Sequence, residues 1–195
     1  MIPITPSPQP LVMTAQQLHT AWPQATAANI QRYLSPLIAT MQRHNISTPL
    51  RRAHFLAQLG WESGQGAYMH EIASGAAYEW RKDLGNIHPG DGVKYRGEGG
   101  IEVTGLLGFQ LFQEYIATRP EFTGIDVIAH PELVGNDPRL WAESAGWFWD
   151  EHGLNALADQ DKVNAITRIV NGGYNGLSGR IACLGNCKSA LGCAA

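Results

Sequence analysis

Charge is scarce in this sequence, and long apolar runs are missing from it. Charged residues make up 16% of the 195 residues, and the net charge is −3. The chain as a whole is therefore not an electrostatic binder of nucleic acid, membranes or anionic cell walls. No apolar run approaches the roughly 18 residues that a membrane span needs. The chain does not start with a positively charged region followed by an apolar one, so we expect no signal peptide. We expect synthesis in the cytoplasm.

Motifs for metal ions and nucleotides are also lacking. The sequence has three cysteines, Cys183, Cys187 and Cys193, and an odd number leaves at least one thiol free or paired between chains. Cys183 and Cys187 are one helical turn apart, which suits a metal ion better than a disulfide, but no fourth ligand is evident, and free thiols are favoured in the cytoplasm. Residues 97–100 are rich in glycine, yet they include an acid and no lysine follows, which argues against a phosphate site. We therefore predict no metal ion and no cofactor.

Hydrophobic residues make up 44% of the chain, which is enough for a sizeable core in one domain. The first ten residues hold four prolines and no charged side chain, a composition typical of an extended arm. No internal repeat and no linker divides the rest. The sequence predicts a flexible proline-rich arm over residues 1–12 and a single domain over residues 13–195, which we expect to be a monomer.

One expected helix carries an acid on its apolar face. Thr48 suits an N-cap, and Pro49 follows at the first helical position, where a missing N–H costs nothing. Phe55, Leu59 and Glu62 then recur at i, i+4 and i+7, so they share one face. An acid on such a face loses hydration, which raises its pKa and suits a general acid near neutral pH. Glu62 is therefore a candidate catalytic acid.

A second acid, Glu71, follows Glu62 nine residues later. In one continuous helix the two residues would be about 13 Å apart, whereas an inverting glycosidase holds its two carboxyl groups roughly 6.5–9.5 Å apart. Gly64 and Gly66 can end the helix and reverse the chain, which brings Glu71 back across a cleft. The alternative is that both acids are solvated surface charges, and the residues alone favour that alternative.

Helical signals recur through the rest of the chain. Thr14 and Gln17 form a capping box at the start of one helix. Residues 75–100 are polar and contain glycines, so we expect a loop region along the cleft with room for a short β-hairpin. Further helices are expected over residues 26–34 and 35–45, after Thr104, from Asp137 to Gly153, and from Val163 to Asn171.

Three segments, residues 54–64, 95–105 and 169–177, carry a family resemblance. They read HFLAQLGWESG, YRGEGGIEVTG and IVNGGYNGL. In this order they resemble glycoside hydrolase family 19, which holds chitinases and phage or bacterial cell-wall lysins, and the resemblance runs from Thr14 to Arg180. It implies a mainly α-helical, lysozyme-like domain with two lobes around a central substrate cleft. It also implies hydrolysis in a single displacement with inversion.

The resemblance assigns catalytic roles to three residues. Glu62 matches the general acid, which protonates the leaving oxygen as the sugar gains oxocarbenium character. Glu71 matches the general base of the short-loop bacterial and phage members, and it takes a proton from the water that attacks the opposite face of the ring. Thr104 matches a hydroxyl residue that helps to hold this water, since a hydroxyl both donates and accepts.

Residues around these three are candidate sugar contacts. Trp61 and Tyr95 are the aromatic residues beside the proposed site in sequence, and we interpret them as stacking surfaces. The aromatic residues at 141–149 fall at helical spacing, and we interpret them as core. Asn171 and Arg180 have structural alternatives, a helix C-cap and a surface charge respectively. The predicted substrate-binding residues are Trp61, Tyr95, Glu102, Asn171 and Arg180.

The central motif departs from the family at four positions. Glu98 stands where Arg is common and Glu102 where Gln is common, while Leu106 and Gly108 replace an Arg and an Asn. Two added acids beside a carboxylate pair are expected to raise the pKa values of neighbouring acids, because like charges repel. The substitutions leave the predicted fold intact and bear on substrate choice, pH optimum and activity.

The sequence thus predicts an enzyme that cleaves β-1,4 links of bacterial peptidoglycan, of the endolysin or antibacterial-effector type. We expect it to act on the cell wall after holin-dependent release, or after delivery with an immunity protein as partner. Two alternatives stay open: a chitinase that cleaves N-acetylglucosamine polymers, and a non-catalytic glycan-binding or interaction protein on the same scaffold. The expected ligand in each case is a peptidoglycan or chitin-like glycan, with no nucleic acid and no membrane span.

Overall fold

The computed structural model describes residues 11–193, which form ten α-helices and three single-turn 3-10 helices. The first ten residues of the predicted proline-rich arm lie outside this range. Leu11, near the end of that arm, packs against the larger core. No helix within residues 11–193 has both the length and the hydrophobicity that crossing a membrane requires.

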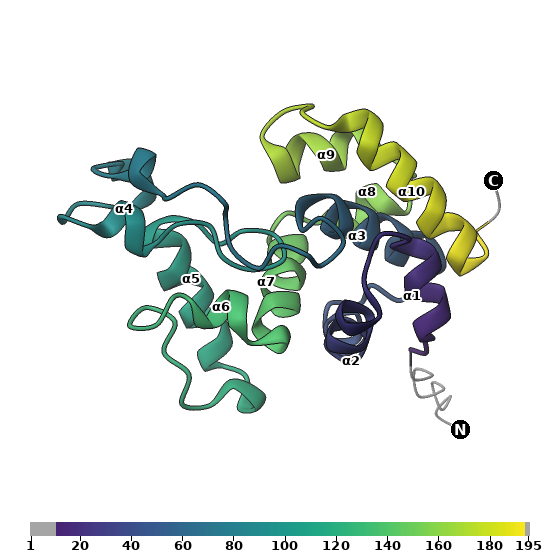
Figure 1. Ribbon diagram of the computed structural model, residues 1–195, viewed down its shortest axis with the longest axis horizontal. Helices are drawn as coiled ribbons and strands as arrows, with labels where there is room; N and C mark the ends of the chain where they lie inside the picture. Colours follow the sequence, from purple (N-terminus) through teal and green to yellow (C-terminus); the bar gives the residue numbers. More distant parts are fainter. Residues whose placement is uncertain (1–10, 194–195) are drawn as a thin grey trace, which may run out of the picture.

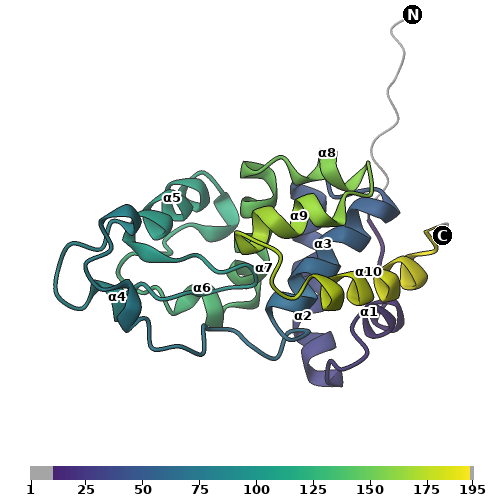
Figure 2. The same ribbon diagram turned by 90° about the horizontal axis from the view of Figure 1, so that it is seen from above.

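The helices fall into two groups, with α7 (Pro138–Glu151) between them (Figure 1, Figure 2). The larger group consists of α1 (Ala15–Ala21), α2 (Ala27–Arg43), α3 (Pro49–Glu62), α8 (Leu154–Ala158), α9 (Val163–Asn171) and α10 (Leu177–Leu191). The smaller group consists of η1 (Ala76–Tyr78), η2 (Lys82–Leu84), α4 (Asp91–Lys94), α5 (Gly105–Ala117), η3 (Pro120–Phe122) and α6 (Leu133–Asn136). This is the mainly α-helical, two-lobed arrangement that the sequence predicts.

Several helix starts lie where the sequence predicts them. Thr14 caps α1 in a capping box with Gln17. Thr48 Oγ1 accepts from an N–H in the first turn of α3, and the Asp137 carboxylate does the same for α7. In each case a side-chain oxygen satisfies an N–H group that has no partner within its own helix.

Helix α2 differs from the prediction of two pieces over residues 26–34 and 35–45. It runs unbroken from Ala27 to Arg43 with Pro36 inside it. A proline in a helix interior removes one backbone hydrogen bond and costs about 3 kcal/mol. Tyr33 and Leu37, on either side of this proline, are both fully buried. Burial of one continuous apolar face therefore outweighs the cost of the proline.

Two hydrophobic cores lie under the two groups of helices. The larger core includes Phe55, Trp141 and Trp149, and the smaller core is built around Phe109 and Phe112 of α5. The full burial of Trp141 and Trp149 confirms the interpretation of these two aromatic residues as core.

A buried polar network joins the two groups of helices. Glu143 of α7 is fully buried and accepts hydrogen bonds from Thr40 at 2.9 Å, from Arg43 Nε at 3.0 Å and from the Tyr115 hydroxyl at 2.7 Å. His44 Nε2 lies 3.1 Å from the same carboxylate. Because Thr40, Arg43 and His44 belong to or follow α2 while Tyr115 belongs to α5, one carboxylate links both groups.

Three short extended segments lie side by side where the two cores meet. They are joined by isolated antiparallel bridges, His70 with Glu98 and Glu98 with Val103. Ile101, in the turn before Val103, packs in the larger core, and Val103 packs in the smaller one. No longer hairpin forms in the described residues. We call these segments the bridge ribbon, which consists of residues 69–71, 97–99 and 103–104.

Candidate active site

Glu62 is the last residue of α3, and the chain reverses directly after it. Gly64, Gln65 and Gly66 have positive φ angles of 55°, 60° and 81°. Glycine adopts such angles without strain, and a side chain on Gly64 would also meet the ring of Tyr68 at 2.6 Å. The chain therefore reverses at Gly64 and Gly66, as the sequence predicts.

Glu62 forms an ion pair with Arg180 of α10. Arg180 Nη2 donates to Glu62 Oε1 at 2.5 Å, and Nη1 donates to Gln58 Oε1 at 2.7 Å. Only 1% of Arg180 is exposed, so its guanidinium is a buried charge that needs these partners. Gln58 in turn donates to Thr167 Oγ1 of α9 at 3.1 Å. The acid at the end of α3 is thus fixed by a chain of contacts that reaches two other helices.

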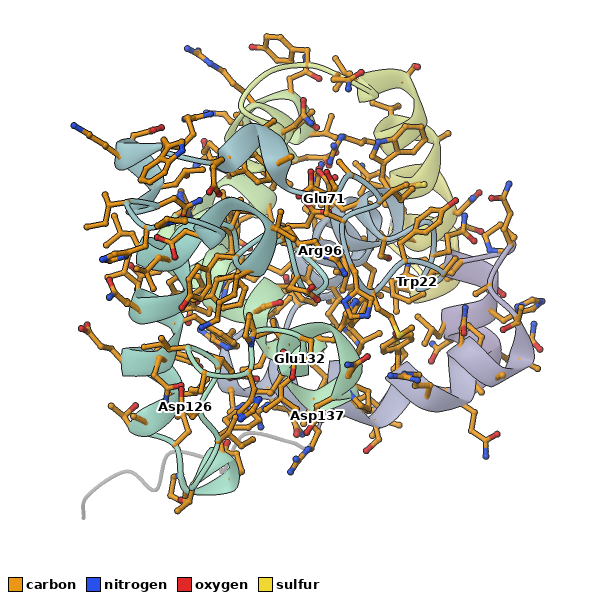
Figure 3. All side chains as sticks on the ribbon, turned by 60° about the vertical axis from the view of Figure 1, so that its left-hand side comes forward. Trp22, Glu71, Arg96, Asp126, Glu132 and Asp137 are labelled. Atoms are coloured by element: carbon orange, nitrogen blue, oxygen red, sulfur yellow. The ribbon has the colours of Figure 1, made fainter. Side chains whose placement is uncertain are left out.

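Glu71 is held by three hydrogen bonds at the bridge ribbon. Its backbone N–H donates to Gly97 O at 2.8 Å, and its carboxylate accepts from Gly97 N at 3.0 Å and from the Tyr78 hydroxyl at 2.9 Å. Burial, followed by the hydrogen bond to Glu71, raises the pKa of Tyr78 to about 12, so this hydroxyl remains a donor at neutral pH. Figure 3 shows Glu71 near the centre of the molecule.

Glu71, Gly97 and Thr104 lie in one row across the bridge ribbon. The bridges place position 71 opposite 97 and position 97 opposite 104, and side chains alternate between the two faces of an extended segment. The neighbouring row consists of the bridged residues His70, Glu98 and Val103, and their side chains point to the opposite face. A methyl group on Gly97 would lie 2.5 Å from Glu102 Oε2, so the side chain of Glu102 covers this position.

Glu62 and Thr104 border a cleft of about 380 Å³ between the two groups of helices. Helix α3 contributes Glu62, α9 contributes Asn171, and the segment around the end of the ribbon contributes Glu102 and Thr104. The cleft thus brings together four of the predicted site residues, and Glu71 adjoins it through its partner Tyr78. The lining consists of Glu62, Tyr78, Ile101, Glu102, Thr104, Phe148, Val170 and Asn171.

Two aromatic residues of this cleft are not predicted by the sequence analysis. Phe148 shares a helical face with Trp141 and therefore looks like core, yet it is only partly buried and lines the cleft. Tyr78 lies in an irregular region that has no periodicity to orient its side chain. Its only signal is an aromatic hydroxyl seven residues after Glu71, and such a spacing has no structural meaning in a loop.

The two predicted stacking residues lie elsewhere. Tyr95 is 4% exposed, packs on Phe109 and donates its hydroxyl proton to Ile128 O at 3.2 Å. It belongs to the smaller core, which corrects its interpretation as a sugar-stacking surface. Trp61 is 42% exposed, but it covers Gly179 of α10 and lines a separate pocket. Consecutive residues of a helix point in different directions, so Trp61 does not share the cleft with Glu62.

Glu102 is the third carboxyl group at the cleft. Its side chain opens to solvent, but it stands over Gly97 and close to the other acids. Desolvation by the surrounding protein, followed by the negative charges of Glu71, Glu62 and Glu98, raises the pKa of Glu102 to about 7. The raised pKa thus belongs to one of the added acids itself, and desolvation is its largest cause.

Glu98 does not face the cleft. It is 3% exposed on the opposite face of the ribbon, where it pairs with His70 Nδ1 and lies 3.4 Å from Arg96 Nε. Burial raises the pKa of Glu98, and His70 and Arg96 oppose that rise in part. The expectation that Glu98 stands beside the catalytic carboxylates is corrected: two basic side chains enclose it.

The two other departures from the family motif lie on α5. Leu106 packs against the smaller core, and its backbone N–H donates to Asn86 Oδ1 at 2.9 Å. A methyl group added at Gly108 would contact Val103 at an ordinary 3.6 Å. Neither residue lines the cleft.

The cysteines do not form a site. All three are free thiols, and burial raises the pKa of both Cys183 and Cys187. Among residues 11–193, no three His, Cys, Asp or Glu side chains come together in a way that could hold a metal ion.

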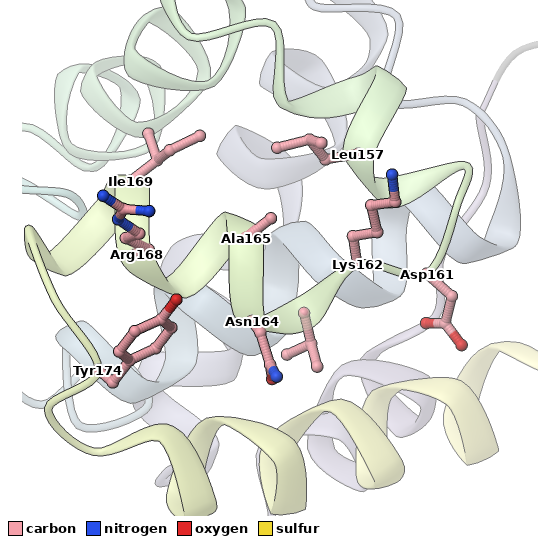
Figure 4. A pocket seen from close by; sticks show the side chains of 9 residues that line it. Leu157, Asp161, Lys162, Asn164, Ala165, Arg168, Ile169 and Tyr174 are labelled. Carbon is pink, nitrogen blue, oxygen red and sulfur yellow. The ribbon is translucent and has the colours of Figure 1, made fainter.

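A larger hollow of about 830 Å³ lies along α9 (Figure 4). Ile169 and Tyr174 give it an apolar wall, and Lys162 and Arg168 give it positive charge. It contains a single acid, Asp161, so it lacks the two carboxyl groups that acid–base cleavage of a glycan uses. Size alone therefore does not identify the active site.

Two curated proteins are similar to the chain in sequence. A glycosyl hydrolase family 19 domain-containing protein of Haemophilus influenzae is 33% identical over 110 residues, which cover 56% of this chain and 49% of that protein. An endochitinase of Arabidopsis thaliana is 30% identical over 121 residues, which cover 62% of this chain and 39% of that protein. The resemblance to glycoside hydrolase family 19 is confirmed. No family model matches the chain, and the chain spans about half the length of these relatives or less.

Solved family 19 structures share the fold. Chitinase C of Streptomyces griseus is 18% identical, with 92% of this chain and 76% of that chain covered and a TM-score of 0.67. A class IV chitinase of Zea mays is 20% identical, with 89% and 90% covered and a TM-score of 0.68. The predicted lysozyme-like fold is confirmed, and the family 19 relatives point to a glycoside hydrolase.

Proposed function

We propose that the chain is an inverting glycoside hydrolase that cleaves β-1,4 links between N-acetylated sugars. The observation that carries this proposal is that Glu62 lines a cleft which Glu71 adjoins through Tyr78, and that each acid has a different set of partners. Glu62 is paired with Arg180, and Glu71 is held by Gly97 and Tyr78. Two carboxyl groups in different environments suit an acid and a base in one reaction.

Glu62 is the proposed general acid. Its Oε1 accepts from Arg180, while its Oε2 has no hydrogen-bond partner among the described residues. Oε2 is therefore free to carry a proton to the glycosidic oxygen. As the bond between the sugar and that oxygen breaks, the leaving oxygen takes the proton. Arg180 then stabilises the carboxylate that Glu62 becomes.

Glu71 is the proposed general base. Gly97 and Tyr78 each use one lone pair of its carboxylate, which leaves acceptor capacity for a water molecule. Thr104, in the same row of the ribbon, is proposed to orient that water. The water oxygen bonds to the ring carbon on the side opposite the leaving group, and its proton passes to Glu71, which inverts the configuration.

A neutral N-acetylglucosamine polymer, as in chitin, is the first proposed substrate. Two Arabidopsis thaliana relatives are named endochitinases. Glu62, Glu71 and Glu102 also give the cleft a negative potential, which disfavours an anionic glycan at the point of cleavage.

Peptidoglycan is the second candidate, because its sugars are also β-1,4-linked and its peptide stems carry carboxylates. Lys162 and Arg168 stand along α9, whose Asn171 lines the cleft. Basic side chains on that helix suit the stems. On this reading the enzyme acts on the cell wall after release or delivery from the cytoplasm, with a holin or an immunity protein as its biological partner.

The test is to incubate the purified protein with chitin oligomers and with peptidoglycan over a broad pH range, and to analyse the products. Proton NMR of the first products identifies the anomer, and inversion gives an α product from a β link. Cleavage of neither polymer contradicts the proposal. Saturable glycan binding without products would instead support a non-catalytic scaffold.

A further inference from the structure

His70 and Glu98 form an ion pair on the face of the bridge ribbon that turns away from the cleft. They are directly opposed residues of an antiparallel bridge. The backbone hydrogen bond from Glu71 N to Gly97 O, at 2.8 Å, flanks them instead of joining them. This pattern is that of a non-hydrogen-bonded pair, in which opposed side chains come closest.

The pair is enclosed by protein. Glu98 is 3% exposed, and a buried carboxylate is unfavourable unless it is paired. Gly135 of α6 closes over the pair, because a methyl group there would lie 2.6 Å from both Glu98 Oε2 and His70 Cε1. Arg96 Nε approaches from the side at 3.4 Å. The two side chains therefore have one packed arrangement.

The neighbours of this pair are the residues that hold the proposed base. Glu71 follows His70, Gly97 precedes Glu98, and Gly97 N donates to Glu71 Oε2 at 3.0 Å. Registers of short strands are weakly specified unless side chains fix them, and here the bridge consists of one pair. We propose that His70 and Glu98 are positioning residues that fix the register of the ribbon and thereby hold the Glu71 carboxylate at the cleft. This inference rests on the proposed role of Glu71 as general base.

The pair also gives a physical reason for an acid at position 98. An arginine there would meet His70 and Arg96, two basic groups, in a buried site. Glu98 supplies the opposite charge. A misplacement of about 1 Å in a catalytic group can lower the rate by about a hundredfold, so a contact that fixes one register has a direct effect on turnover.

The test compares Glu98→Ala, His70→Ala and Glu98→Gln in the full chain. The two alanine variants remove the contact, and we expect kcat to fall by about tenfold to a hundredfold while KM stays within about twofold. Glu98→Gln keeps the shape and one hydrogen bond to His70, so kcat should return to within about threefold of wild type.

A matched control exists on the surface. His130 and Glu132 form a second His–Glu pair at 3.5 Å, with side chains 65% and 53% exposed. Glu132→Ala removes a similar contact between two exposed side chains. It should change neither kcat nor KM, since exposed pairs contribute little.

Hydrogen exchange gives a second readout that does not need catalysis. In Glu98→Ala and His70→Ala, the amides of Glu71 and Gly97 should exchange at least about tenfold faster, while the amides of α3 keep their protection. Unchanged exchange at both amides overturns the inference whether or not the wild type cleaves a glycan. Faster exchange with unchanged kcat overturns the positioning role. A wild type that cleaves no glycan contradicts the proposed function, while faster exchange would still support the contact that fixes the ribbon.

If Glu98→Ala loses protection throughout the chain, His70→Ala decides the question. It removes the same contact from the more exposed side, where 27% of the His70 side chain is accessible.

Discussion

Arg180 and Glu62 are 118 residues apart in the chain and are joined by a 2.5 Å hydrogen bond from Nη2 to Oε1. The arginine side chain is buried, whereas the glutamate side chain is 26% exposed toward the cleft. The last helix therefore reaches back to the end of α3, and the geometry of the proposed acid depends on both helices.

Replacing Arg180 with Met should lower both stability and activity. Glu62 and Gln58 lose a shared partner, and removing one member of a buried ion pair costs about 3–5 kcal/mol. Because Glu62 is partly exposed, we expect the lower end of that range, which is a fall in Tm of roughly 6–12 °C for a chain of this size. Loss of orientation at Glu62 should lower kcat by about a hundredfold. Calorimetry and product assays measure the two effects.

Arg139→Met is the control for this experiment. Arg139 pairs with Asp137 at 2.5 Å on the surface, with 55% of its side chain exposed. Its replacement should change the free energy of unfolding by no more than about 1 kcal/mol and leave cleavage intact. Equal losses in both variants would show that the Glu62 contact has no special role.

The two proposed catalytic acids can be tested by isosteric change. Glu62→Gln and Glu71→Gln should each abolish cleavage while the circular dichroism spectrum stays close to wild type. Glu62→Gln also leaves the buried Arg180 without its charged partner, so its Tm should fall, whereas the Tm of Glu71→Gln should stay close to wild type. Glutamine keeps the shape but neither donates a proton to a leaving oxygen nor takes one from water. Full activity in either variant would reject the role assigned to that residue.

Tyr78→Phe tests the support of the proposed base. The change removes one of two donors to the Glu71 carboxylate and keeps the ring in place. A hydrogen bond of this kind contributes about 1–1.5 kcal/mol, so kcat should fall by about tenfold with KM nearly constant. Steady-state kinetics on a chitin oligomer measures kcat and KM separately. A change in KM alone would mean that Tyr78 binds sugar instead of positioning Glu71.

Local features of this molecule could be predicted from the sequence, and contacts between distant segments could not. Thr48 and Asp137 are readable as helix caps because capping is a signal within a few residues. The predicted sugar contact of Tyr95 is wrong, because its position next to the motif says nothing about the face on which its side chain lies. The His70–Glu98 pair spans 28 residues and depends on the register of two short segments, which no periodicity sets.

Glu102→Gln tests how the third acid affects stability with pH. The folded pKa of Glu102, about 7, lies above its ordinary value of 4.5. The folded state thus binds the proton more tightly than the unfolded state. Glu102 therefore contributes most to the free energy of unfolding below pH 4.5, and this contribution falls as pH rises from 4.5 toward 7. Glu102→Gln should lack this loss of stability, which thermal unfolding measured between pH 4.5 and 7 would show.

The same variant should change the pH dependence of cleavage. Below pH 7, protonated Glu102 carries no charge, as a glutamine would, and above it a third negative charge stands beside Glu62 and Glu71. A like charge nearby favours the protonated form of an acid, so its removal in Glu102→Gln should move the alkaline limb of kcat/KM downward by about one pH unit. Glu114→Gln, an exposed change on α5, is the control. Identical profiles for wild type and Glu102→Gln would mean that Glu102 does not influence the reaction.

Glu143 should control acid stability through the network that joins the two groups of helices. Burial alone raises the pKa of Glu143, but hydrogen bonds from His44, Arg43 and Tyr115 outweigh it and hold the pKa well below its ordinary value of 4.5. The stabilisation is therefore complete above pH 4.5 and is lost as pH falls toward the folded pKa.

Glu143→Ala removes the carboxylate that Thr40, Arg43, His44 and Tyr115 share as a partner. We expect a loss of about 3–5 kcal/mol at neutral pH and a smaller loss of stability on acidification than in wild type, because the variant has no depressed carboxyl group to titrate. Glu151→Ala, at the exposed end of the same helix, should change neither quantity. Parallel denaturant titrations at neutral and acidic pH measure both. If Glu143→Ala loses as much stability on acidification as wild type does, the acid sensitivity comes from other carboxylates, and the network serves only to connect α2, α5 and α7.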